Sequence, residues 1–262
     1  MIETLDRNGY PTRAMDVSPL NRVVPGSDIY FDRDTRWCDL VRSPLDAGVA
    51  QRIKAYTATL PDGTRHPGAG CCHVGVAVPS LHVWDYCPTC RDYHSVTLYC
   101  QRCHTKTIRG NVDIIEARAW VEWQWGIPHL HGDVTRRPLS TVLDYPGVVL
   151  SIEPDWPEEN HPDMRPAQQE TDPNGFWKDR VVGRAIEIWE GAEGYDFGLI
   201  INRWKPQRFA FPDDPLRWMC SELQADALNA ANISIPTPSC EPSPSDCYAY
   251  ALSTGKPIWR IG

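Results

Sequence analysis

The sequence of 262 residues lacks a long apolar run, a positive charge excess and any internal repeat or low-complexity tract. No stretch approaches the ~18 consecutive apolar residues of a transmembrane helix, so we expect no membrane span. Lys and Arg number 26 against 34 Asp and Glu, and the net charge of −8 makes nucleic acid an unexpected partner. Residues 1–7 contain two acidic side chains and no apolar core, so we predict no secretory signal and expect synthesis in the cytoplasm.

The composition is that of a folded globular chain. Hydrophobic residues make up 42% and charged residues 23%, which excludes disorder as the main state. The length allows one large domain or two small ones. Because the chain has 24 Pro and 11 Trp, we expect many loops and aromatic side chains in the core rather than a helical bundle.

Cysteine is abundant, and four of the ten cysteines form two C-x-x-C pairs. The pattern C-x2-C-x9-C-x2-C suits the two ends of a short β-hairpin and can place four thiolates around Zn²⁺. Because no position is left open for water, we predict a structural zinc ribbon inserted at residues 79–111, with an iron–sulfur cluster as the less favoured occupant. His94 and His104 are neighbours rather than expected ligands. The predicted ligands are Cys87, Cys90, Cys100 and Cys103.

Apolar periodicity and turn residues predict both strands and helices. We expect a long surface loop at 153–174, where Pro, Asp, Glu and Asn predominate. Cys71, Cys240 and Cys247 are interpreted as small buried apolar residues. Strands are predicted at 28–31, 73–78, 112–120, 147–152 and 181–189, and helices at 43–58 and 220–231.

Six short motifs follow one another along the chain. They are Gly-Ser-Asp-Ile at 26–29, His-Val-Gly-Val-Ala-Val at 73–78, Ile-Ile-Glu-Ala at 114–117, Gly-Tyr-Asp-Phe at 194–197, Trp-Met-Cys-Ser-Glu-Leu at 218–223 and Pro-Ser-Pro-Ser-Asp at 242–246. Together they resemble circularly permuted papain-like cysteine hydrolases, the YiiX-like branch of the NlpC superfamily, in which the His strand precedes the Cys helix. The resemblance implies an α+β fold, with an antiparallel sheet packed on helices, over residues 26–262 after an N-terminal arm at 1–25. The ribbon insertion and the long 120–180 segment depart from the family pattern.

The residues of these motifs also make chemical sense by themselves. A cysteine at a helix N-terminus, such as Cys220, has its thiolate stabilised by the helix dipole. An imidazole from a neighbouring strand can pair with that thiolate and later protonate the leaving group, a role assigned to His73. A carboxylate on the next strand can hold the other ring nitrogen, and Glu116 is the candidate.

Each candidate also has a structural interpretation. Cys220 can be a buried thiol, His73 a sheet histidine with satisfied hydrogen bonds, and Glu116 a solvated strand residue. Residues 213–215, Asp-Asp-Pro, are themselves a good helix start. A helix that begins at Pro215 would place Cys220 in its second turn, where the dipole has less effect.

The leading hypothesis is an amidase or endopeptidase that acts through an acyl-cysteine intermediate. The resemblance to NlpC-type enzymes implies peptide substrates, including the peptides of bacterial peptidoglycan. It also implies that the protein acts as a phage tail or lysis component and is incorporated into a virion. The alternative is a structural or docking protein of a large assembly, which binds protein partners without catalysis. Nucleic-acid binding through the ribbon is disfavoured, because its basic cluster is modest and consists of Arg91, Arg102, Lys106 and Arg109.

Overall fold

The computed structural model describes residues 4–5, 11–12, 19–33, 59–60, 62–87, 89–90, 92–94, 99–125, 127–145, 147–158, 164, 173–196, 214–237 and 242–261. The helix predicted at 43–58 lies outside these residues, and so does Cys240. Within the residues described, no helix is long and apolar enough to cross a membrane.

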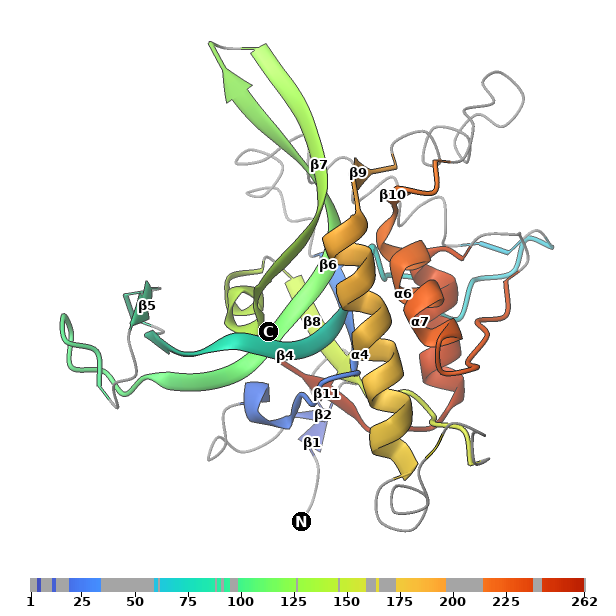
Figure 1. Ribbon diagram of the computed structural model, residues 1–262, viewed down its shortest axis with the longest axis horizontal. Coiled ribbons are helices and arrows are strands. Elements are labelled where there is room, and N and C mark those ends of the chain that lie inside the picture. The colour runs from blue at the N-terminus through green and yellow to red at the C-terminus, as the bar shows by residue number, and fades with distance from the viewer. Residues whose placement is uncertain are drawn as a thin grey trace.

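A seven-stranded antiparallel sheet forms the centre of the fold (Figure 1). Its strand order is β11-β8-β3-β4-β6-β7, and β5 pairs with the end of β4. The strands predicted at 28–31, 73–78, 112–120 and 147–152 are confirmed, and two of them, β4 and β6, are much longer than predicted. The strands are β3 (Asp28–Arg33), β4 (His73–Cys87), β5 (Asp92–His94), β6 (Ile108–Gln124), β7 (Ile127–Pro138), β8 (Gly147–Ile152) and β11 (Ile258–Arg260).

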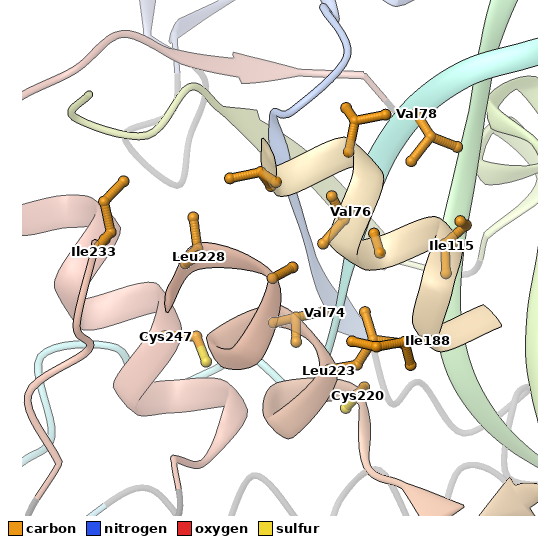
Figure 2. Packing of buried hydrophobic residues seen from close by; sticks show 14 of the residues in the cluster. Val74, Val76, Val78, Ile115, Ile188, Cys220, Leu223, Leu228, Ile233 and Cys247 are labelled. Carbon is orange, nitrogen blue, oxygen red and sulfur yellow. The ribbon is translucent and has the colours of Figure 1, made fainter. Parts of the chain in front are cut away.

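Helices cover one face of this sheet in the described part of the chain: α4 (Pro173–Gly191), α6 (Cys220–Asn229) and α7 (Pro244–Ser253) (Figure 1). Alternate residues of β4, among them Val74 and Val76, point toward the helices and are fully buried. Figure 2 shows these valines in one cluster with side chains of the helices. A large antiparallel sheet with helices packed on it confirms the α+β class.

The strand predicted at 181–189 is wrong, because these residues belong to α4. The buried residues Val181, Val182, Ala185 and Ile188 follow the spacing i, i+1, i+4, i+7, which is one face of a helix. The β-branched side chains favour a strand locally. Packing of the whole apolar face against the sheet overrides that preference.

The opposite face of the sheet carries a smaller core. Phe31 of β3 and Ile114 of β6 pack there against two short 3-10 helices, η1 (Pro19–Arg22) and η2 (Leu139–Asp144). Alternation along β6 places Glu116 on the same face as Ile114.

Two β arms extend from the body of the protein (Figure 1). The ends of β4 and β6 form the first arm together with β5, and this arm carries the two C-x-x-C pairs. Both strands run through residues 79 and 111, the predicted limits of the insertion. The β6–β7 hairpin forms the second arm and turns at Trp125, whose φ is 55° and whose side chain is 100% exposed.

Short strands complete the fold. In the predicted N-terminal arm, β1 (Thr4–Leu5) pairs with β2 (Pro11–Thr12), and elsewhere β9 (Gly194–Tyr195) pairs in parallel with β10 (Arg217–Trp218).

The surface loop predicted at 153–174 needs a correction. Its described residues before α4 form no helix or strand, but Trp156 and Met164 are buried in the core on the helix side of the sheet. Large apolar side chains therefore anchor this segment to the core.

Candidate functional site

Cys220 is the first residue of α6, and the local structure explains why the helix begins there. Pairing of β10 with β9 keeps the chain extended up to Met219, whose φ and ψ are −87° and 159°. The backbone N–H of Met219 donates to Glu222 Oε2 at 3.1 Å and caps the first turn. The alternative helix start at Pro215 is therefore wrong, and Cys220 lies in the turn where the helix dipole acts.

The motif at 194–197 supports this entry into the helix. Tyr195 of β9 pairs with Trp218 of β10, and the Asp196 N–H donates to the Trp218 carbonyl oxygen at 3.2 Å. Asp196 is 4% exposed. These residues therefore hold the backbone that leads into Cys220.

His73 is the first residue of β4, the strand that α6 packs against. Its side chain is 21% exposed, and its ring centroid lies 5.0 Å from that of Phe31, its partner on β3. Cys220 lies close enough to His73 to interact electrostatically with the ring. The Nε2 atom of His73 lies 2.8 Å from Glu116 Oε2, so Nδ1 is the ring nitrogen that remains available to the sulfur.

Glu116 is fully buried on β6, and its two carboxylate oxygens have different partners. Oε2 contacts His73, whereas Oε1 accepts a hydrogen bond from Arg137 Nε on β7 at 2.6 Å. Arg118 Nε lies 3.3 Å from the same Oε1, on a side chain that is 43% exposed. The interpretation of Glu116 as a solvated strand residue is therefore wrong.

A glycine permits the close approach of the two strands at this point. Gly75 follows His73 by two residues and lies beside the Val76–Ile115 pair of the β4–β6 ladder. A Cβ atom on Gly75 would lie 2.8 Å from Ile114 Cδ1 and 2.9 Å from the Ile115 carbonyl oxygen. Any larger residue would push β6, and with it Glu116, away from His73.

The site is strongly polarised. Burial disfavours the charged form of His73, but Cys220 and Glu116 outweigh it and raise the pKa of the ring to about 9. Burial also opposes ionisation of Glu116, yet His73 and Arg137 lower the pKa of its carboxyl to about 2. At neutral pH the pair is therefore an imidazolium and a carboxylate. An imidazolium beside a cysteine is a setting in which a thiol acts as a nucleophile.

The motif at 26–29 contributes a buried polar cluster beneath α6. Asp28 is 1% exposed, and its Oδ2 accepts a hydrogen bond from the Tyr30 hydroxyl at 3.2 Å. Gln224 Nε2 of α6 donates to the Tyr30 oxygen at 2.8 Å. Burial raises the pKa of Asp28 to about 7, and within the described residues Asp28 Oδ1 has no hydrogen-bond partner. This motif therefore places a carboxyl that retains its proton in mild acid under the cysteine helix.

The motif at 242–246 forms a helix cap. Ser243 and Asp246 make a capping box at the start of α7, with Ser243 N donating to Asp246 Oδ2 at 2.7 Å. Asp246 Oδ1 lies 3.0 Å from Nε2 of His66, whose Nδ1 accepts a hydrogen bond from Gly68 N at 3.0 Å. Since Nδ1 faces Gly68 N, Nε2 is the ring nitrogen that faces Asp246. This second His–carboxylate pair, which the sequence did not reveal, ties α7 to a loop.

The two C-x-x-C pairs converge in the first arm, and their four sulfur atoms all lie within 4.8 Å of one another. Cys87 Sγ is 3.4 Å from Cys103 Sγ, and Cys90 Sγ is 3.7 Å from Cys100 Sγ. A tetrahedral Zn²⁺ with Zn–S bonds of ~2.3 Å would place its sulfur ligands ~3.8 Å apart. The four cysteines therefore fit a metal ion such as zinc.

The turn after the second pair is tight. The Cys100 N–H donates to the Thr105 carbonyl oxygen, and the His104 N–H donates to the Cys100 carbonyl oxygen, both at 2.8 Å. These bonds hold His104 in the left-handed region with a φ of 58°. His104 does not belong to the metal-ligating group, and the side chain of His94 lies outside the described residues.

The sequence did not reveal Arg137, because it did not reveal β7. The segment His129-Leu-His131 has a composition that by itself favours a polar loop, but it lies within β7. Trp125-Gly126, between two segments of alternating polarity, is the hairpin signal that could have predicted this strand.

No family model matches this sequence, and neither a curated protein nor a solved structure matches it. What the fold and site define is an α+β protein with a Cys–His–Glu cluster and a separate group of four cysteines. The resemblance to permuted papain-like hydrolases rests on short motifs alone and belongs to the proposal that follows.

Proposed function

We propose that this protein is a cysteine hydrolase that cleaves an amide, thioester or ester through an acyl-Cys220 intermediate. The observations that carry the proposal are the His73–Glu116 hydrogen bond and the electrostatic interaction of His73 with Cys220, the first residue of α6. A thiol at a helix N-terminus, an imidazole and an orienting carboxylate are the parts that nucleophilic acyl transfer requires.

In the proposed reaction, Cys220 reacts as a thiolate beside the His73 imidazolium. The Cys220 thiolate attacks the carbonyl carbon, a C–S bond forms, and the negative charge moves to the carbonyl oxygen near the Cys220 N–H. The intermediate collapses, the bond to the leaving group breaks, and His73 donates its proton to that group. Neutral His73 then takes a proton from water, the water oxygen attacks the acyl carbon, and the thiolate leaves.

The Glu116 contact and the exposure of His73 determine how a substrate carbonyl would approach the Cys220 sulfur. Glu116 binds Nε2 of the ring, which keeps Nδ1 turned toward the sulfur through both half-reactions. The His73 side chain is 21% exposed, whereas Cys220 is 5% exposed. A substrate carbonyl would therefore reach the sulfur along the face of the imidazole.

The family resemblance extends the proposal to a substrate class. Motifs shared with permuted NlpC-type hydrolases favour peptide amides, and among them the cross-linking peptides of bacterial peptidoglycan. A phage tail or lysis protein would encounter such peptides, and the two arms would suit a protein held in an assembly.

We also propose that the four cysteines of the first arm hold a structural Zn²⁺. All four ligands are thiols, so the ion would have no position open for water or substrate. The arm has a thin core of its own, since Leu81, Val83 and Tyr99 are all more than half exposed. Metal binding would replace the missing hydrophobic stabilisation.

A docking protein without catalysis is the second candidate, and the exposed apolar residues of the two arms favour it. Leu81 and Tyr99 in the first arm are 62% and 59% exposed, and Ile127 in the second arm is 60% exposed. Such residues are typical of surfaces that bind a partner. A docking protein would keep the arms but would place no demand on the reactivity of Cys220.

Acylation of Cys220 tests the hydrolase against the docking protein. The protein is mixed with p-nitrophenyl acetate at pH 6.5, and the acetyl group is located by peptide mass spectrometry. The hydrolase predicts a burst of nitrophenol equal to the protein concentration, acetyl on Cys220, and loss of both in Cys220→Ala but not in the matched variant Cys71→Ala. Slow acetylation spread over several cysteines, without a burst, would reject the hydrolase.

A further inference from the structure

Glu116 has a second strong partner that the proposed reaction has not used. Arg137 Nε lies 2.6 Å from Oε1, the oxygen that does not contact His73. The Glu116 side chain is fully buried and that of Arg137 is 20% exposed, so the ion pair is largely shielded from water. A bond this close in a dry site is much stronger than a surface ion pair.

The guanidinium of Arg137 is itself held in place from behind. Its Nη1 atom donates to the Thr141 hydroxyl of η2, which donates in turn to the Pro138 carbonyl oxygen at 2.7 Å. On the β6–β7 ladder Arg137 pairs with Ile114, two residues before Glu116. The arginine therefore reaches Glu116 diagonally across the strands, from a base fixed by the backbone.

The neighbouring arginine shows what a purely structural arginine does in the same strand. Arg136 points to the helix side of the sheet, where its Nε lies 3.1 Å from Asp113 Oδ2 and its guanidinium lies 5.1 Å from the ring of Trp189 on α4. Its side chain is 7% exposed. Arg136 thus joins the sheet to a helix, whereas Arg137 ends on the carboxylate behind His73.

We propose that Arg137 is a positioning residue that keeps Glu116 ionised and its Oε2 aimed at His73. The inference rests on the proposed function. It adds Arg137 to the proposed set of Glu116, His73 and Cys220.

The charges around Glu116 explain why Arg137 is needed. His73 faces it from β4, Arg118 from β6 and Arg137 from β7, and Cys220 of α6 acts on it through His73. The Arg118–Glu116 distance is longer, at 3.3 Å, and the Arg118 side chain is 43% exposed, so water screens its charge. Without Arg137, Oε1 would keep only the longer and more exposed contact with Arg118, and burial would be opposed by fewer charges, which raises the pKa of the carboxyl. Protonation would remove the charge that stabilises the imidazolium.

The test compares the wild type with Arg137→Met, Arg137→Lys and the matched control Arg136→Met. NMR of ¹⁵N-histidine-labelled protein follows the His73 Nε2–H signal between pH 4 and 7. In parallel, the rate of Cys220 alkylation by iodoacetamide is measured at pH 5 and pH 7. Arg136→Met also removes a buried ion pair from β7, so it controls for a general loss of stability.

The proposal predicts a specific acid sensitivity. His73 and, after it, Arg137 outweigh burial and hold the Glu116 pKa at about 2, against an ordinary value of 4.5, so the Nε2–H signal should persist to pH 4 in the wild type and disappear at higher pH in Arg137→Met. Protonation of Glu116 weakens the stabilisation of the His73 imidazolium, and with it the fraction of Cys220 that is thiolate. Alkylation of Cys220 at pH 5, relative to pH 7, should therefore fall roughly tenfold in Arg137→Met for each pKa unit of this stabilisation that is lost. Arg137→Lys should restore part of this loss, and Arg136→Met should show none of it.

The outcomes separate this proposal from the hydrolase. Rapid alkylation of the wild type with an unchanged pH profile in Arg137→Met would overturn the role of Arg137 and leave the hydrolase intact. Slow alkylation of the wild type would overturn the hydrolase, and the His73 signal would still report whether Arg137 keeps Glu116 ionised. An equal effect in Arg136→Met would reduce Arg137 to a structural residue.

Discussion

The four cysteines of the first arm and the single Cys220 obtain their neighbours from different parts of the chain. The four cysteines of the first arm lie within one stretch of chain, and two strands with their turns suffice to bring them together. Cys220 depends on partners from distant parts of the chain, since His73 opens β4 and Glu116 lies on β6. The comparison shows that a cysteine cluster able to hold a metal can be assembled locally, whereas the surroundings of Cys220 require the sheet and a helix together.

The surroundings of the sulfur atoms differ as much as their origins. In the first arm the four sulfurs face one another, with Cys87 Sγ 3.4 Å from Cys103 Sγ and Cys90 Sγ 3.7 Å from Cys100 Sγ. Four thiols gathered in this way suit a metal ion that binds them as thiolates. Cys220 instead faces an imidazole whose pKa is raised to about 9. The same residue type therefore has very different neighbours in the two places, as the two proposed roles require.

Metal removal should have the largest effect and should separate the two groups. Structural zinc contributes on the order of 10 kcal/mol in small domains, so we expect a chelator to unfold the first arm. Hydrogen exchange measured by mass spectrometry should rise sharply in the peptides of residues 87–106 and stay unchanged in α6. Cys220 alkylation should also be unchanged. Equal loosening of α6 would contradict the separation.

Single cysteine variants should give the second largest effect, and each variant should change either hydrolysis or zinc content but not both. Cys220→Ala should lower hydrolysis of an activated ester on the order of 10³-fold while the bound zinc stays at one per chain. Cys90→Ser should lower the zinc content and leave ester hydrolysis near the wild-type rate. Zinc is measured by atomic emission and hydrolysis by nitrophenol release. If Cys90→Ser abolished hydrolysis, the metal would belong to the active site.

Asp28, the carboxyl beneath α6, should have a smaller effect, which is a pH dependence of the free energy of unfolding. Asp28 has a folded pKa of about 7 against an ordinary 3.8, so its favourable contribution is complete below about pH 4 and is lost as the pH rises to about 7. Between pH 5 and pH 8 the wild type should lose roughly 3 kcal/mol of unfolding free energy that Asp28→Asn does not lose. Urea unfolding at both pH values measures this. A parallel pH profile in Asp28→Asn would contradict the raised pKa.

The smallest effect should lie in the turn of the first arm. His104 has a φ of 58°, which costs a non-glycine residue roughly 1 kcal/mol. His104→Gly should therefore bind zinc a few-fold more tightly in a chelator competition, and Cys220 alkylation should not change. Weaker zinc binding would show that the imidazole contributes to the site.

These two groups also mark how far the sequence could predict the structure. The four cysteines were predictable because their spacing alone fixes their geometry. The strands of His73 and Glu116 were predictable from alternation, and the helix start at Cys220 was decided only by the pairing of β10 with β9. Arg137 was not predictable, because its contact depends on the β6–β7 register. The helix at 173–191 was missed because its β-branched residues mask a helical period.

The most direct test of the central claim is the alkylation rate of Cys220 at pH 6, measured by peptide mass spectrometry. The wild type is compared with His73→Ala and with His66→Gln, which alters the other histidine–carboxylate pair. An unpaired thiol with a pKa near 8.5 is less than ~1% ionised at this pH and should react slowly. Many-fold faster labelling in the wild type and His66→Gln, lost only in His73→Ala, is the predicted result. Equally slow labelling in all three would contradict an activated Cys220–His73 pair.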